Sequence, residues 1–129
     1  MVERRGPMMR KQRNDLILVC HCETLPEATV LRLAGEINLT TVPILEGSLT
    51  TALQRGGHVI VDMKDVRYID ASLYQVLARL RERRPALPQR LVLVGLTPSI
   101  QQTVNLLGLQ RVAEITASVE SAKRWLDIC

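Results

Sequence analysis

The sequence is almost free of aromatic side chains, with one Trp, two Tyr and no Phe among 129 residues. Such a chain lacks the stacking platforms on which single-stranded nucleic acids are bound, which argues against a nucleic-acid partner. Its core must be built from Leu, Val, Ile and Ala, and the length suffices for one domain with a substantial core.

Long apolar runs are also lacking, because no run exceeds about six residues while a bilayer-spanning helix needs about 20. The first run, residues 16–20, is shorter than the apolar segment of a secretory signal peptide. We therefore expect no membrane insertion and a cytoplasmic location. Three cysteines without a secretion signal predict no disulfide framework.

Motifs that carry phosphate or catalytic chemistry are missing as well. The sequence contains no G-x-x-x-x-G-K-[ST], no G-x-G-x-x-G and no G-x-S-x-G. Asp62, Asp65 and Asp70 would suit a magnesium cluster, but they equally suit two turn residues and a helix cap, which we favour. We expect a protein that is not an enzyme and has no cofactor.

A metal site at Cys20, His21 and Cys22 is disfavoured for a geometric reason. In a β-strand, alternation places the two cysteines on one face and the histidine on the other, so the three ligands cannot converge. We predict a strand here and no metal.

The positive charge is concentrated at the N-terminus. The first 13 residues carry five positive side chains and one negative, which accounts for the whole net charge of +4. We interpret residues 1–14 as a flexible basic arm, with contact to nucleic acid or acidic lipid as the alternative. Four arginines near the end of the second predicted helix are either a solvated face or a patch for an acidic partner: Arg79, Arg81, Arg83 and Arg84.

The rest of the chain alternates between strand and helix patterns. Residues 16–22 and 29–35 predict an antiparallel pair joined by a loop of about six residues. Helices are predicted at 40–55, 71–84, 98–107 and from Ser118, the last with Trp125 packed inward. Short strands are predicted at 59–61, 66–69, 90–95 and 111–115, with a turn between the first two.

This order predicts an α/β fold for residues 15–129. Strands joined by single helices require right-handed crossovers, so we expect one domain with a mixed, mostly parallel sheet of four to five strands and about four helices. Functional groups in such sheets gather where strands end and helices begin, which selects the turns at 35–41, 62–72 and 95–99.

The segment Asp70-Ala71-Ser72 stands out within those turns. With Asp70 as N-cap, Ser72 is the second helical residue, where free backbone N–H groups favour a phosphate. A phosphoryl group there would add about two negative charges to a nearly neutral surface, enough to alter partner docking. The alternative is an unmodified serine at a helix start.

The sequence resembles the STAS domains of anti-sigma-factor antagonists over about residues 16–127. Five blocks carry the resemblance, of which the third is the most specific: Gly35-Glu36-Ile37-Asn38, Val59-Ile60-Val61-Asp62-Met63, Val66-Arg67-Tyr68-Ile69-Asp70-Ala71-Ser72-Leu73, Leu91-Val92-Leu93-Val94-Gly95 and Leu106-Leu107-Gly108-Leu109. The resemblance implies a bacterial transcription regulator that acts by partner switching. It implies binding to a serine-kinase anti-sigma factor, release on phosphorylation and restoration by a phosphatase.

The chain departs from that family pattern at three positions. The usual phosphoacceptor position is Ala71, the usual Gly is Leu73, and the usual acid after the Gly-Glu motif is Asn38. Either Ser72 replaces the lost acceptor, or the protein is a binding module that no kinase silences. We favour the second, since Ala71 removes the nucleophile.

The resemblance assigns partner binding to seven residues: Asn38, Thr40, Thr41, Asp70, Ala71, Ser72 and Tyr74. Tyr74 is either exposed or half-buried. Two alternatives stay open for the function, a STAS subunit that regulates a lipid or anion transporter and a small-ligand-binding module. A homodimer also stays open.

Overall fold

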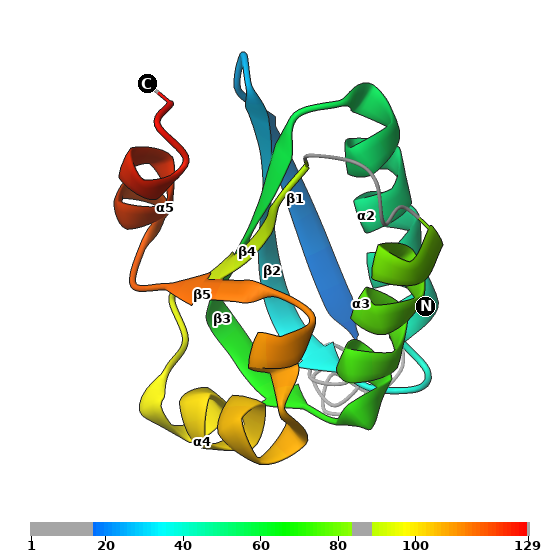
Figure 1. The fold of residues 1–129 in the computed structure, drawn as a ribbon. Coiled ribbons are helices and arrows are strands. Elements are labelled where there is room, and N and C mark those ends of the chain that lie inside the picture. The colour runs from blue at the N-terminus through cyan, green and yellow to red at the C-terminus, as the bar shows by residue number, and fades with distance from the viewer. Residues whose placement is uncertain (1–16, 84–88, 129) are drawn as a thin grey trace, which may run out of the picture.

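A computed structural model describes residues 17–83 and 89–128 of the chain (Figure 1). One sheet contains five strands in chain order, β1 (Leu18–Thr24), β2 (Ala28–Ile37), β3 (His58–Ile69), β4 (Leu91–Val94) and β5 (Glu114–Thr116). The β1–β2 pair is antiparallel and the three other pairs are parallel. The predicted α/β fold with a mixed, mostly parallel sheet is confirmed.

Five helical segments connect and follow the strands: α2 (Val42–Arg55), α3 (Ala71–Arg83), α4 (Pro98–Leu107), the 3-10 turn η1 (Leu109–Arg111) and α5 (Val119–Trp125). From β2 to β5, each strand lies next to the preceding one and on the same side of it. Right-handed connections between such parallel strands place their helices on one face of the sheet. α2 and α3 cover that face, whereas α5 lies against the other (Figure 1).

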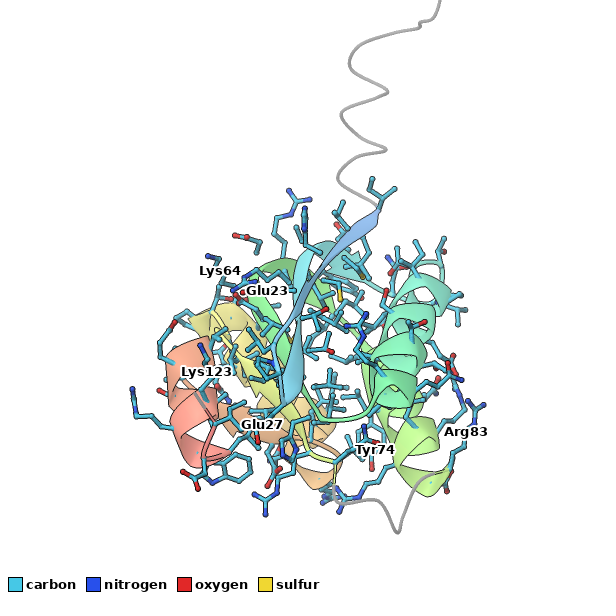
Figure 2. The ribbon with its side chains drawn as sticks, turned by 90° about the horizontal axis from the view of Figure 1, so that it is seen from above. Glu23, Glu27, Lys64, Tyr74, Arg83 and Lys123 are labelled. Carbon is cyan, nitrogen blue, oxygen red and sulfur yellow. The ribbon has the colours of Figure 1, made fainter. Side chains whose placement is uncertain are left out.

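The two faces bury unequal cores. The larger core joins the apolar stripes of α2, α3 and α4 to one side of the sheet, and Leu49, Val76 and Val104 are fully buried in it. The smaller core, under α5, consists of six buried residues: Ala28, Val30, Ile60, Val92, Val94 and Ala122. The face of the sheet that α5 covers also carries charged side chains. Glu23, Lys64 and Lys123 lie on this side of the molecule, and Arg83 of α3 lies on the opposite side (Figure 2).

Helix starts follow the predicted capping signals. The Thr97 hydroxyl accepts a hydrogen bond from the Ile100 amide at 3.3 Å, and Pro98 follows as the first residue of α4. Ser118 likewise accepts from the Ser121 amide at 3.1 Å. These side chains satisfy amide groups that have no partner within the helix.

The main correction concerns β3, which is one strand of twelve residues instead of two short strands separated by a turn. Asp62 is therefore not a turn residue. It is 6% exposed within the strand, and its Oδ2 lies 3.8 Å from Nε of Arg32 on β2. Pairing with β2 continues past this point through a register shift, so the neighbouring strand keeps the polar segment extended.

Three smaller details also differ from prediction. The β1–β2 loop has three residues, 25–27, because Thr24 and Thr29 still pair across the strands. The last strand begins at Glu114, after η1. Trp125 is 44% exposed, and the guanidinium of Arg90 lies over its ring, 4.6 Å from the centroid.

Gly35 marks a close approach between the edge strand and its neighbour. Its φ of +117° is unusual for other residues, and a Cβ atom there would lie 2.1 Å from the Ile17 carbonyl oxygen. That oxygen accepts a hydrogen bond from the Glu36 amide at 3.3 Å. Only glycine allows β1 to begin at this position.

The predicted arm at residues 1–14 and Arg84 lie outside the described residues. Within residues 17–83 and 89–128, no helix is both long and apolar enough to span a bilayer.

Candidate functional site

Two of the three predicted turns meet at one edge of the sheet, the edge formed by the carboxyl ends of β2 and β3. Strands β2 and β3 are parallel neighbours, with Glu36 opposite Tyr68 and Ile37 opposite Ile69. The chain therefore leaves both strands at the same level, at residues 38 and 70, and α2 and α3 start side by side (Figure 1). We call residues 38–41 and 70–74 the paired-turn surface. It contains all seven residues assigned to partner binding from the sequence.

The third predicted turn, residues 95–99, lies elsewhere. It follows β4, a strand of four residues whose last residue, Val94, pairs with Asp62. Asp62 precedes Asp70 by eight positions in the chain. A Cβ atom on Gly95 would lie 2.8 Å from the Asp62 carboxylate, which places this turn beside the middle of β3. This turn therefore does not join the other two, because β4 is too short to reach that edge.

The turn before α2 is held by a dense hydrogen-bond network. The Asn38 side-chain oxygen accepts from the amides of Thr40 at 2.9 Å and Thr41 at 3.1 Å. The Thr41 hydroxyl donates to the Glu36 carbonyl at 2.8 Å and accepts from the Asn38 amide at 3.0 Å. Thr41 is 3% exposed, so its hydroxyl is an internal support, whereas Thr40 is exposed.

The turn before α3 is simpler. Oδ1 of Asp70 accepts a hydrogen bond from the Ser72 amide at 2.8 Å, and the Asp70 carbonyl accepts from the Leu73 amide at 3.1 Å. Asp70 thus caps α3 as predicted. The Ser72 amide is not free, contrary to the prediction of open N–H groups at this position, because the carboxylate of the preceding turn already occupies it.

Ala71 and Ser72 differ in exposure. Ala71, the first residue of α3, is exposed, whereas Ser72 is 8% exposed and counts among the buried residues of that helix. The position open to solvent therefore has no hydroxyl, and the position with a hydroxyl turns toward the interior. Tyr74 is half-buried against the larger core, which resolves the alternatives left open for it.

Leu39 is an exposed apolar residue of this surface that the sequence analysis missed. It lies between Asn38 and Thr40 and is 76% exposed. A signal was present, because Leu39 precedes α2 and falls outside the stripe of buried residues that begins at Val42. Leu39 thus adds an exposed apolar side chain to an otherwise polar turn.

The surface is nearly uncharged apart from the helix ends. Neither α2 nor α3 has an acidic residue in its first turn. Asp70 is the only carboxylate of the paired-turn surface, and it caps the N-terminus of α3 with its partial positive charge. The polar backbone edge and the exposed Leu39 are suited to docking of a protein segment.

The arginines at the other end of α3 pair within the protein. Arg79 lies 2.8 Å and Arg83 lies 3.6 Å from the Glu46 carboxylate on α2, and Arg81 donates to the Arg111 carbonyl at 3.3 Å. Contacts of this kind tie α3 to its neighbours. They favour the solvated, structural interpretation of this cluster over a separate anion patch.

No metal site is found within the described residues, where no three His, Cys, Asp or Glu side chains form a group that could hold an ion. Cys20 and Cys22 both point toward α2 and line a groove there. His58, at the start of β3, accepts a hydrogen bond at Nδ1 from the Arg90 amide at 3.1 Å, which gives it a structural role.

Comparison with known proteins identifies a family and a set of similar folds. The family model of the STAS domain matches residues 11–122. An anti-sigma factor antagonist from Mycobacterium paratuberculosis has a TM-score of 0.75 at 18% identity, and the match covers 85% of this chain and 94% of that one. Unphosphorylated SpoIIAA, also an anti-sigma factor antagonist, has a TM-score of 0.66 at 22% identity, covering 86% and 99%.

A different kind of protein has the same fold in one part of its chain. SLC26A9 is similar with a TM-score of 0.67 at 12% identity, covering 81% of this chain and 20% of the longer one.

Proposed function

The chain belongs to the STAS domain family, and from this premise we propose that it is a non-enzymatic partner-binding protein of the anti-sigma-factor antagonist kind. It binds a serine-kinase-type anti-sigma factor through the paired-turn surface and thereby acts on transcription. The similar folds of two anti-sigma factor antagonists support this choice of partner.

The observation that carries the proposal is the pairing of the two turns around an exposed apolar residue. Residues 38–41 and 70–74 lie at one edge because β2 and β3 end in register, and Leu39 is 76% exposed there. A partner that covers Leu39 would bury apolar surface, while the polar turn around it would supply hydrogen bonds and orientation.

We further propose that this protein is not switched off by phosphorylation. The exposed first residue of α3 is Ala71, which has no hydroxyl to attack a phosphoryl group. Ser72 is the neighbouring candidate, but it is only 8% exposed, so its side chain would have to turn outward to receive a phosphoryl group. The phosphoryl group would then compete with the Asp70 carboxylate for the backbone amide of Ser72. A phosphatase then has no substrate on this surface.

The binding part is tested by gel filtration with the serine-kinase-type anti-sigma factors of the same cell. We expect a stable complex that Leu39→Asp weakens at least about tenfold, because a charge replaces the apolar anchor. Val19→Asp is the matched control, since Val19 is also exposed, at 49%, but lies on β1 outside the paired-turn surface. Absence of a complex with every such kinase, or equal loss in both variants, overturns the proposal.

The phosphorylation part is tested separately by intact mass after incubation of the complex with ATP. We expect the native chain to gain no phosphoryl group, and Ala71→Ser to gain one and leave the complex. Phosphate recovered on Ser72 or on the exposed Thr40 of the native chain contradicts this part without affecting the binding part.

A second candidate function is regulation of a lipid or anion transporter as its STAS subunit. The likeness to a fifth of the SLC26A9 chain favours it, because that protein shows the same fold within a longer chain. Purification of the native chain from a detergent extract distinguishes the two. Recovery with a membrane transport complex and without a kinase supports the transporter alternative.

A further inference from the structure

A groove of about 480 Å³ runs between the edge strand β1 and helix α2, outside the paired-turn surface. It exists because small side chains face each other across it. Helix α2 presents Gly47, Ser48, Thr51 and Ala52, and β1 presents Cys20 and Cys22. The buried Leu31 of β2 forms the floor, so the lining is mostly apolar.

Gly47 is one of the small residues that keep the groove open. It lies in the interior of α2, where glycine weakens a helix relative to alanine. Its φ is not in the left-handed region, and an added Cβ atom would meet nothing within 4 Å. Neither backbone conformation nor crowding therefore requires glycine at this position, and the missing side chain leaves space on the groove side of the helix.

The two ends of the groove differ in chemistry. Pro43 and the 48% exposed Ile44 line it at the start of α2, and Arg55 lines it at the end. Ile44 and Arg55 are eleven residues apart, which corresponds to about 16 Å along an α-helix. The groove is thus elongated, with an apolar end and a cationic end.

Arg55 brings a positive charge that is not neutralised within the described part of the chain. Its Nη1 donates to the hydroxyls of Thr24 at 2.7 Å and Thr29 at 3.3 Å, and lies 3.9 Å from Sγ of Cys22. Several carboxylates of described residues pair with other arginines, namely Arg32, Arg79, Arg83 and Arg90, and none of these pairs involves Arg55. The threonines fix the guanidinium at the groove end, ready to pair with an anion.

The middle of the groove carries no charge of its own. Burial raises the pKa of the Cys20 thiol, and this effect outweighs the opposing hydrogen bond from Ser48. Cys20 is therefore a neutral, weakly polar part of the wall at physiological pH.

We propose that the β1–α2 groove binds a fatty carboxylate, with its carboxylate on Arg55 and its alkyl chain along Leu31 toward Ile44. The shape selects an extended chain, the single guanidinium selects one anionic head group, and the absence of other charges in the lining selects a chain without polar substituents. This site is separate from partner binding, so its test needs no anti-sigma factor.

Titration calorimetry of the full chain with dodecanoate, below its micelle concentration, provides the test. We expect saturable binding with one site per chain. Octanoate should bind at least about tenfold more weakly because fewer methylene groups are buried. Dodecanol, which has the same chain length and no charge, should also bind at least about tenfold more weakly.

Two variants locate the bound molecule. Gly47→Leu fills the groove while improving helix propensity, and it should abolish binding without unfolding the protein. Gln54→Leu adds the same side chain at an exposed position of α2 that does not line the groove, and it should bind as the native chain does. Arg55→Gln should weaken dodecanoate by about tenfold or more and leave dodecanol unchanged, whereas Arg124→Gln on α5 should change neither.

Each of the opposite results overturns the proposal. If the native chain does not bind dodecanoate, a fatty carboxylate is not the ligand of the groove. Binding that survives Gly47→Leu places the molecule elsewhere, and binding that survives Arg55→Gln removes the role of the head group. Alkylation of Cys22 by iodoacetamide gives an independent measurement, because dodecanoate bound in the groove should slow it in the native chain and not in Gly47→Leu.

Discussion

The turns that lead into α2 and α3 occupy equivalent places at the ends of neighbouring strands, yet they are held in different ways. The first depends on the buried Thr41 hydroxyl and the side-chain oxygen of Asn38, which together make four hydrogen bonds within residues 36–41. The second depends on one carboxylate, Asp70, at the helix start. The first turn is built into the interior, whereas the second is capped at the surface.

Because of this difference, the turn before α2 is the rigid part of the paired-turn surface, and the turn before α3 is the part that tolerates substitution. Because the first turn closes on a buried hydroxyl, it presents Leu39 in a fixed position. The second turn can accept a different residue at the exposed position 71 with little structural consequence. The position that the sequence resemblance assigns to the phosphoacceptor, Ala71, is in this second turn, where we expect a substitution to cost the fold little. Four substitutions test the contrast.

Thr41→Val should have the largest effect on stability. It keeps the shape of the side chain but leaves the Glu36 carbonyl and the Asn38 amide without their partner, which costs about 2 kcal/mol. Urea unfolding measures the loss, and Thr40→Val, at an exposed position of the same turn, should stay within about 0.5 kcal/mol of the native chain. Equal effects of the two substitutions would show that the first turn is not supported from inside.

Asp70→Ala should destabilise by about 1 kcal/mol, because α3 loses its N-cap. Asp65→Ala serves as the control, since Asp65 is exposed on β3, and should change the free energy of unfolding by less than about 0.5 kcal/mol. A loss at Asp70 as large as that expected for Thr41→Val would erase the difference between the two turns.

Asn38→Asp should be neutral or stabilising by about 0.5 kcal/mol. The carboxylate keeps the acceptor for the Thr40 and Thr41 amides and adds a favourable charge at the start of α2. Asn38→Ala, which removes the acceptor, should cost about 1 kcal/mol. Thermal unfolding of both variants checks whether the amide acts as an acceptor, and a destabilised Asn38→Asp would speak against it.

Ala71→Ser should have the smallest effect, below about 0.3 kcal/mol, because an exposed first residue of a helix accommodates serine without repacking. Chemical denaturation of the unphosphorylated variant measures this value. A cost above about 1 kcal/mol would mean that the second turn is as constrained as the first. The variant would then be unsuitable for testing phosphorylation.

The fold could largely be predicted because its signals are local. The stripe of α2, Val42 through Leu53, is visible as apolar spacing of three and four, and Asp70, Thr97 and Ser118 act as caps where expected. Capping and periodicity need only nearby residues, so they can be recognised without knowing what packs against the helix.

Other features depend on distant neighbours and could not be predicted. The polar middle of β3 stays extended because β2 pairs with it and Arg32 faces the buried Asp62. The turn at 95–99 misses the paired-turn surface because of the length of β4. For the candidate site, the sequence could name residues 38–41 and 70–74, but the burial of Ser72 and the exposure of Leu39 depend on how the helices lie on the sheet.

The glycine beneath the beginning of β1 also has a consequence for the outer part of the sheet. Any larger residue at position 35 would collide with the Ile17 carbonyl oxygen and lift the outermost strand away from β2. The separated β2 would then expose a row of unpaired amide and carbonyl groups, which is a template for strand exchange and for aggregation between molecules. The hydrogen atom in place of a side chain at Gly35 thus lets β1 keep the backbone groups of β2 paired.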